Sequence, residues 1–223
     1  MVFGSRIEIV VFSGAYGQAH HYTDILEAAR SVFPGCVTHL LVPHEVATTT
    51  TDGWWAPYAP RASEILHQVL RGLEFAEAVD AAEQWTYHAD LGRMPAILAA
   101  VPHLQTGWQR IYVGVSNGAI PAAAAALHFK DASGLWFASG VVDPSQLSEL
   151  KALDCTIAVS AATREHYWGG FRGVLHPWAS LASTHVFDGK HAWETLAVAV
   201  EVFSQLASSH REKDDSNKNN NED

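Results

Sequence analysis

Cysteine is scarce in this chain, and its positions match no recognisable pattern. The two cysteines, Cys36 and Cys155, lie far apart among 223 residues and form no CxxC pair. The sequence therefore indicates neither a disulfide framework nor a zinc site, and a reducing compartment fits best. A single α/β domain of this length buries roughly 70% of the surface that its unfolded chain exposes, so it needs neither disulfides nor a metal to hold a core.

Basic residues are also few. The chain has 14 Lys and Arg against 24 Asp and Glu, which gives a formal net charge of -10. Proteins that bind nucleic acid neutralise phosphates with clustered Lys and Arg, whereas the basic residues here are spread along the chain. A nucleic-acid partner and attachment to an acidic membrane surface are therefore both disfavoured.

Long apolar runs are missing as well. A membrane-spanning helix needs about 18 consecutive apolar residues, and no such stretch occurs. The N-terminus lacks the basic region and the small-residue cleavage site of a secretory leader. The first apolar run, over residues 7–12, leaves little room for a leader before it. We therefore expect a cytoplasmic protein with no membrane span.

Short apolar runs alternate with segments of helical spacing, a pattern typical of a parallel sheet with crossover helices. The expected strands cover residues 7–12, 37–42, 110–115, 134–139, 156–160 and 184–187. The expected helices cover residues 22–32, 62–78, 91–100, 118–127, 144–150 and 191–207. The predicted fold class is α/β, a three-layer sandwich in which a mostly parallel sheet of about six strands carries helices on both faces.

Two regions break this alternation. Residues 48–60 contain four consecutive threonines and then a run rich in proline and aromatic residues, which predicts a long loop of the kind that often serves function. From residue 208 onward the chain is polar and cannot bury enough apolar surface to fold. The predicted organisation is one domain over residues 1–207 followed by a disordered polar tail over 208–223.

The motif that carries chemistry is Gly114-Val115-Ser116-Asn117-Gly118, which follows an expected strand and precedes an alanine-rich helix. GxSxG in this setting is typical of a nucleophile elbow, a sharp turn that lifts the serine hydroxyl above the edge of a sheet. The glycines are needed because the serine adopts a strained backbone conformation and a flanking side chain would collide with the neighbouring strand or helix. Ser116 is therefore the candidate nucleophile.

With this motif in this place, the sequence resembles the α/β-hydrolase superfamily over roughly residues 6–207. The resemblance is to the compact esterase and thioesterase-like branch. It implies that the first two strands of the family sheet are absent and that the run at 7–12 matches the third. It also implies a catalytic triad in the chain order nucleophile, acid and histidine. No cofactor is expected.

In the family the catalytic histidine follows the last strand, after a short glycine-containing loop, at the start of the last helix. The segment Asp188-Gly189-Lys190-His191 matches this arrangement. The resemblance therefore makes His191 the general base toward Ser116 and then the general acid toward the leaving group.

The acid of the triad usually follows the penultimate strand of the family sheet. Glu165 occupies this place, where the family more often has an aspartate. Asp143, which follows the preceding expected strand, is the alternative acid, although it is also a good helix N-cap. Asp188, close to His191 in the sequence, fits a turn better. Glu165 and Asp143 both stay open at this point.

Acyl transfer also needs two backbone N–H donors for the developing oxyanion. Asn117, which follows the nucleophile, supplies one of them. By resemblance the other comes from the loop after the first strand, which reads Ser13-Gly14-Ala15-Tyr16-Gly17 and makes Ala15 the second donor. No GxGxxG or GxxxxGK[ST] pattern is present, so phosphate binding is not indicated.

Aromatic residues gather on segments that we expect around Ser116, and ligands of α/β folds bind at the carboxyl ends of the strands. An apolar or aromatic substrate pocket is therefore expected. Its predicted lining residues are Tyr16, His20, Trp54, Trp55, Trp168 and Trp193. The 13 histidines match no metal-ligand spacing, so no metal site is expected.

These features predict a serine hydrolase that cleaves a carboxylic ester or thioester of a small, apolar or aromatic substrate through an acyl-enzyme on Ser116. Two alternatives stay open. One is a lyase or C–C hydrolase that uses the same residues. The other is a non-catalytic small-molecule receptor with the hydrolase fold. The sequence indicates neither the acyl group nor the oligomeric state.

Overall fold

The computed structural model of the chain describes residues 6–14, 19–42, 94–140, 142, 144–165, 175, 178, 182–190 and 194–219. Within these ranges the strands are β1 (Arg6–Phe12), β2 (Val37–Leu41), β3 (Trp108–Val115), β4 (Ala132–Ala138), β5 (Thr156–Arg164) and β6 (Ser183–Lys190). The described strands therefore confirm the expected six apolar runs, with somewhat different ends.

All six described strands belong to one sheet in the order β2-β1-β3-β4-β5-β6, and every neighbouring pair is parallel. Strand β3 lies between β1 and β4, which pair with it along its length. Because all strands run the same way, the segments that follow them emerge at one edge of the sheet. The residues predicted to carry function follow β1, β3, β4, β5 and β6 in the sequence.

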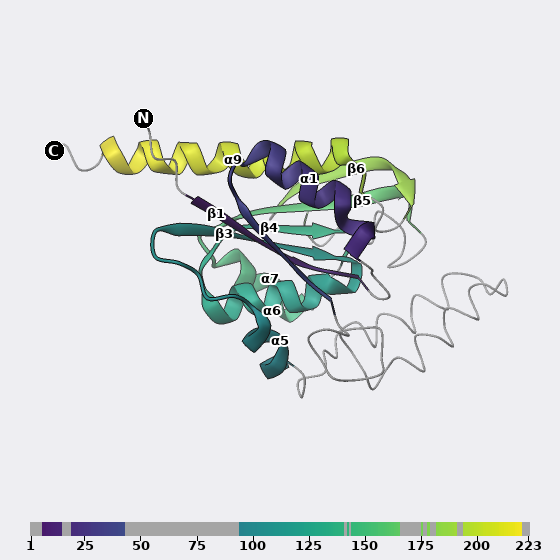
Figure 1. The fold of residues 1–223 in the computed structure, drawn as a ribbon, viewed down its shortest axis with the longest axis horizontal. Helices are drawn as coiled ribbons and strands as arrows, with labels where there is room; N and C mark the ends of the chain where they lie inside the picture. The colour runs from purple at the N-terminus through teal and green to yellow at the C-terminus, as the bar shows by residue number, and fades with distance from the viewer. Residues whose placement is uncertain are drawn as a thin grey trace.

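Helices cover both faces of the sheet (Figure 1). Helices α1 (Thr23–Val32) and α9 (Leu196–Asn219) lie together on one face, whereas α5 (Met94–Ala100), α6 (Ala119–Phe129) and α7 (Pro144–Lys151) lie on the other. Two short 3-10 turns, η1 (Ala19–Tyr22) and η2 (Ser116–Gly118), precede α1 and α6. The three-layer α/β architecture is confirmed, and the helix expected at 62–78 lies outside the described residues.

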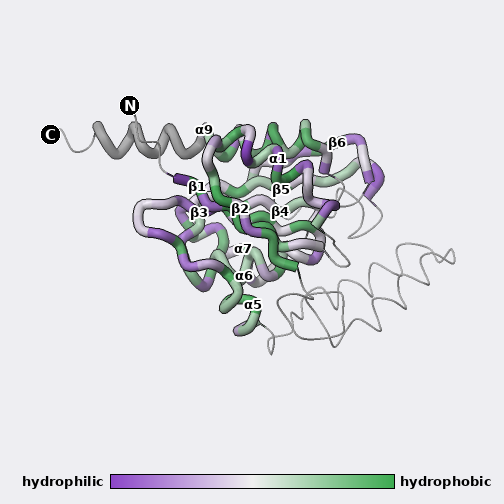
Figure 2. Tube along the Cα trace, in the orientation of Figure 1, coloured by the Kyte–Doolittle hydropathy of each residue, from purple (hydrophilic) through white to green (hydrophobic). Residues whose placement is uncertain are grey.

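The core consists of two apolar layers, one on each side of the sheet. Successive residues of a strand point to opposite faces, so Val11 packs with α1 and α9 while Val10 and Phe12 pack with α6. In Figure 2 much of the hydrophobic colour lies along the strands of the sheet, and several loops and strand ends are hydrophilic. Burial on both sides explains why residues 9–12 of β1 form a continuous apolar run rather than an alternating one.

The last helix differs from its expected bounds of 191–207 at both ends. Helix α9 begins at Leu196, because the Thr195 hydroxyl accepts a hydrogen bond from the Val198 N–H at 3.5 Å and acts as its N-cap. It continues to Asn219 through a segment containing Arg, Glu and Lys, which are good helix formers. The division into a domain over 1–207 and a polar tail over 208–223 stays a prediction.

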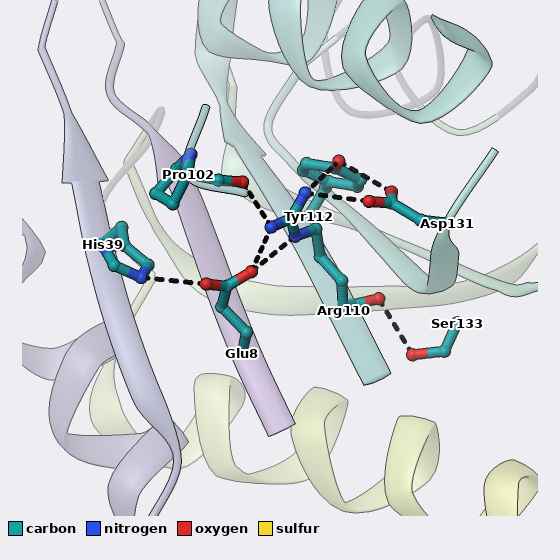
Figure 3. A network of polar contacts seen from close by, with 7 residues as sticks. All are labelled: Glu8, His39, Pro102, Arg110, Tyr112, Asp131 and Ser133. Atoms are coloured by element: carbon teal, nitrogen blue, oxygen red, sulfur yellow. Dashed lines mark hydrogen bonds and ion pairs between the residues drawn. The ribbon is translucent and has the colours of Figure 1, made fainter. Parts of the chain in front are cut away.

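A buried ion-pair network ties the amino-terminal halves of the central strands together (Figure 3). Arg110 of β3 is 1% exposed and donates from Nε to Glu8 Oε2 of β1 at 2.6 Å. Its Nη1 donates to Asp131 Oδ2, just before β4, at 2.8 Å, and its Nη2 donates to the Pro102 carbonyl at 2.5 Å. His39 of β2 adds a contact of 3.1 Å between its Nε2 and Glu8 Oε1. One guanidinium thus links β1, β3 and the segments before β3 and β4.

Tyr112 completes this network and is itself buried. Its hydroxyl donates to Asp131 Oδ1 at 2.8 Å and accepts a hydrogen bond from Arg110 Nη1 at 3.2 Å. Burial is the main cause that raises the pKa of Tyr112 well above its ordinary value. Burial lowers the pKa of Arg110, but its hydrogen bonds to Tyr112 and Glu8 outweigh that effect and leave the pKa raised. Both hydrogen bonds therefore favour the charged form of the guanidinium.

Replacing Arg110 with alanine is expected to lower the free energy of unfolding by about 3–5 kcal/mol, because it leaves the buried Glu8 carboxylate without its cation. Urea denaturation followed by circular dichroism measures the change. Arg30→Ala, which removes an exposed guanidinium from α1, is the matched control and is expected to cost less than about 1 kcal/mol. Equal unfolding midpoints for the two variants would contradict a stabilising role of the network.

Candidate active site

Ser116 follows the last residue of β3, in the middle of the sheet, and begins the turn that leads into α6. Its φ angle is 52°, in the left-handed region that residues with a side chain rarely adopt. Such a conformation costs on the order of 1–3 kcal/mol and persists only where the surrounding structure holds it. The side chain is half-buried. This is the strained strand-to-helix turn that the GxSxG motif predicts.

The two glycines of the motif lie where no side chain fits. A Cβ atom on Gly114 would lie 2.5 Å from the Ala119 Cα, and one on Gly118 would lie 2.6 Å from the Ser13 carbonyl oxygen. Both contacts are with backbone, which cannot move aside as a flexible side chain can. The strand, the turn and the loop after β1 therefore pack closely enough to fix the backbone on both sides of Ser116.

The loop after β1 begins beside the nucleophile. A Cβ on Gly14 would lie 3.3 Å from the Ser116 Cβ, so the two backbones are in near contact. The Gly14 N–H donates to the Tyr22 hydroxyl at 2.7 Å and so is not available to an oxyanion. Ala15 and Tyr16 lie outside the described residues, so the role of Ala15 as the second donor stays a prediction.

Asn117 lies at the amino-terminal end of α6 and is 6% exposed. Its N–H is the oxyanion donor predicted on the elbow side, and the positive end of a helix dipole favours negative charge there. The side-chain Oδ1 is buried and accepts no hydrogen bond from the part of the chain that the structure describes. The sequence motif predicts the role of the Asn117 backbone N–H but nothing about its side chain, because the second x of GxSxG carries no residue preference.

The three candidate acids have different surroundings. Glu165 directly follows β5 and is 7% exposed, and its N–H donates to the Ala162 carbonyl at 3.1 Å. The Asp188 side chain is 87% exposed and accepts a hydrogen bond from the Thr163 hydroxyl at 3.1 Å. Such exposure does not suit a residue that must orient a histidine in a closed site. Asp143 lies outside the described residues.

His191 is itself outside the described residues, but both neighbouring segments are placed. Strand β6 runs to Lys190, so His191 is the next residue after the last strand. The expectation that it starts the last helix is wrong in one respect, since α9 begins five residues later at Leu196. Its place after the last strand agrees with the family order, and its catalytic role stays a prediction.

Of the predicted substrate-lining residues, the structure describes only His20. It is exposed on η1, and its ring lies against that of His21 with the centroids 4.1 Å apart. The role of His20 in contacting the substrate stays a prediction. The remaining members of the set fall outside the described ranges: Tyr16, Trp54, Trp55, Trp168 and Trp193.

Sequence reasoning missed a buried polar cluster near the elbow. Glu194 is 6% exposed, and its Oε1 accepts hydrogen bonds from the Ser139 hydroxyl at 2.9 Å and from the Ser160 hydroxyl at 3.2 Å. The only sequence signal was a glutamate three residues after His191 in a segment expected to be helical. Its partners lie after β4 and within β5, far away in the sequence, and so leave no local pattern.

No group of three or more His, Cys, Asp or Glu side chains in the described ranges is arranged to hold a metal ion. Among the helices that the structure describes, none is long and apolar enough to cross a membrane.

Comparison with known proteins gives a fold rather than a sequence family. No protein-family model and no curated protein sequence matches the chain. Among solved structures, acyl-protein thioesterase 2 from Zea mays matches 92% of this chain and 95% of its own, with a TM-score of 0.54 at 12% identity. Est1E from Butyrivibrio proteoclasticus matches 92% of this chain and 87% of its own, with a TM-score of 0.54 at 9% identity.

A third match is a Xanthomonas campestris protein assigned to the α/β superfamily of hydrolases. It covers 92% of this chain and 99% of its own, with a TM-score of 0.52 at 16% identity. Likeness at these identities concerns the backbone and its topology. The chain therefore has the α/β-hydrolase fold, as its resemblance to that superfamily predicts.

Proposed function

We propose that the protein is a serine hydrolase that cleaves a carboxylic ester or thioester through an acyl-enzyme on Ser116. The observation that supports this most is the backbone of Ser116, held at a φ of 52° directly after the central strand β3. Strain of this kind is retained where it serves a site. Here it places one hydroxyl at the carboxyl edge of a parallel sheet, where ligands of α/β folds bind.

The first half of the reaction forms the acyl-enzyme. The Ser116 Oγ attacks the carbonyl carbon of the substrate while His191 accepts the hydroxyl proton. The carbonyl oxygen becomes an oxyanion between the N–H groups of Asn117 and Ala15. The tetrahedral intermediate then collapses, the bond to the alcohol or thiol breaks, and His191 returns the proton to that leaving group.

The second half regenerates the serine. His191 accepts a proton from a water molecule that attacks the acyl carbon, and the carboxylic acid leaves as the Ser116 hydroxyl recovers its proton. Glu165 orients the imidazole and stabilises its cationic form in both halves. The acid is buried at the end of β5, the position from which the family usually supplies it.

A small apolar or aromatic substrate fits the composition of the segments proposed to surround Ser116. Trp54, Trp55, Trp168 and Trp193 belong to those segments, and a pocket of such residues favours apolar acyl groups. Two of the matched structures support a hydrolase, since one is named as a hydrolase of the α/β superfamily and another as an acyl-protein thioesterase.

The test is covalent labelling of the full chain with a fluorophosphonate probe, followed by mass spectrometry of the labelled peptide. We expect one adduct, on Ser116, and no adduct after heat denaturation, because the probe reacts only with a serine activated by its base. Turnover of p-nitrophenyl esters of increasing acyl length then defines the pocket. No adduct would favour a small-molecule receptor, whereas an adduct on another serine would refute Ser116 as the nucleophile.

A further inference from the structure

Glu194 is a buried carboxylate that the proposed mechanism does not use. Its Oε1 accepts hydrogen bonds from the Ser139 and Ser160 hydroxyls. Ser160 also accepts a hydrogen bond from the Trp136 indole Nε1 at 2.9 Å. Because an indole N–H can only donate, the Ser160 hydroxyl proton is directed to Glu194. One carboxylate oxygen thus joins the segment before α9 to the turn after β4 and to the middle of β5.

The Ser139 end of this cluster leads to the nucleophile elbow. Ser139 has a φ of 50°, and its N–H donates to the Ser160 carbonyl at 2.8 Å. A Cβ on the next residue, Gly140, would lie 2.5 Å from the Ser116 carbonyl oxygen. The turn after β4 therefore contacts the elbow with its backbone and Glu194 with its hydroxyl. A shift of Glu194 would therefore move Ser139, which is the residue next to Gly140 and its contact with Ser116.

A second connection runs to the loop after β1. The Tyr22 hydroxyl accepts the Gly14 N–H at 2.7 Å, at the start of the loop proposed to supply an oxyanion donor. Burial is the largest cause of the raised pKa of Tyr22; hydrogen bonds to Gly14 and Ser13 oppose it, and the nearby negative charge of Glu194 adds to it. Glu194 is therefore close enough to act electrostatically on the group that holds this loop.

We propose that Glu194 is a positioning residue, which fixes the segment carrying His191 against the turn after β4 and against Ser160 of β5 so that the histidine is held near Ser116. Three residues of chain span at most about 11 Å, so anchoring Glu194 limits where His191 can lie. The inference rests on the proposed serine-hydrolase function. Because Glu194 is buried and acts through His191, we expect it to affect turnover rather than substrate binding.

The test compares Glu194→Ala, Glu194→Gln and Ser139→Ala with Glu149→Gln, an exposed glutamate of α7, as the matched control. A misplacement of about 1 Å in a catalytic group costs on the order of 100-fold in rate, so Glu194→Ala is expected to lower kcat by about that factor with little change in KM. Fluorophosphonate labelling should slow in parallel. Glu194→Gln keeps an acceptor oxygen for the two hydroxyls and should restore kcat to within about tenfold of wild type.

Urea denaturation of each variant separates positioning from general loss of structure, since rates are compared only between folded populations. If Glu194→Ala does not fold, Ser139→Ala carries the test, with kcat expected to fall several-fold at unchanged KM. The proposal is overturned if the folded variants label and turn over at the wild-type rate, or if KM changes instead of kcat. Wild-type protein that is not labelled at all would overturn the proposed function itself, a result distinguishable from normal labelling of every variant.

Discussion

Ser116→Ala is expected to lower kcat for ester hydrolysis by at least about 10⁴-fold and to abolish fluorophosphonate labelling. Removal of the nucleophile from a triad leaves only the contribution of oxyanion binding and substrate positioning. The fold should be retained, because alanine keeps the Cβ and loses only an oxygen from a half-buried side chain. The measurements are initial rates with p-nitrophenyl esters, labelling by the probe, and the urea midpoint.

Two further variants make this result specific. Ser204→Ala removes an exposed hydroxyl from α9 and should label and turn over as wild type does. Ser116→Gly should be as inactive as the alanine variant but no less stable, because glycine adopts a φ of 52° without strain. Continued labelling of Ser116→Ala would refute Ser116 as the nucleophile.

The sequence predicts the fold class because the sheet is covered on both faces. Strands such as β1 and β3 are buried on both sides and appear as short apolar runs, which a periodicity argument detects without knowledge of partners. The strand ends are harder to predict, since polar residues continue a strand when a neighbour supplies hydrogen bonds. Strand β6 thus extends through Asp188 and Gly189 to Lys190, where local turn preference favours a bend.

The site is predictable only where its chemistry is local. The elbow could be found from five consecutive residues, because the strained turn and its close packing demand two glycines around Ser116. Glu194 could not be found from the sequence, because its environment depends on Ser139 and Ser160, which are 55 and 34 residues away in the chain. A buried carboxylate is identified by its surroundings, and these exist only once the sheet is assembled.

The network around Arg110 shows the same limit. Glu8 and Arg110 are 102 residues apart in the sequence; Glu8 interrupts the apolar run of β1, and Arg110 stands directly before that of β3. Nothing local distinguishes them from exposed charges at a strand end. Parallel pairing places them opposite one another in β1 and β3, and their burial follows from that register.

Glu165→Gln is expected to lower kcat by about 10³–10⁴-fold, the range found when a triad acid becomes a neutral amide. The amide cannot stabilise the imidazolium that forms in the transition state, and it can select the wrong histidine tautomer. Burial supports this role, because a carboxylate that is 7% exposed acts through a medium of low dielectric constant. The readout is the pH profile of kcat/KM, whose acidic limb reports ionisation of the catalytic base in the free enzyme.

The comparison is completed by Asp143→Asn and Asp188→Asn, which change the two acids that fit the role of the triad acid less well. Asp188→Asn should leave kcat unchanged, because its side chain is 87% exposed and solvent screens its charge. Asp143→Asn should stay within about threefold of wild type if its task is only to cap a helix. A large loss in Asp143→Asn, with Glu165→Gln near wild type, would transfer the role of the acid to the segment after β4. The histidine would then be oriented from β4, which is the direct neighbour of the strand that carries Ser116. The sheet order permits an acid after β4 as well as one after β5, because both strands lie on the same side of β3.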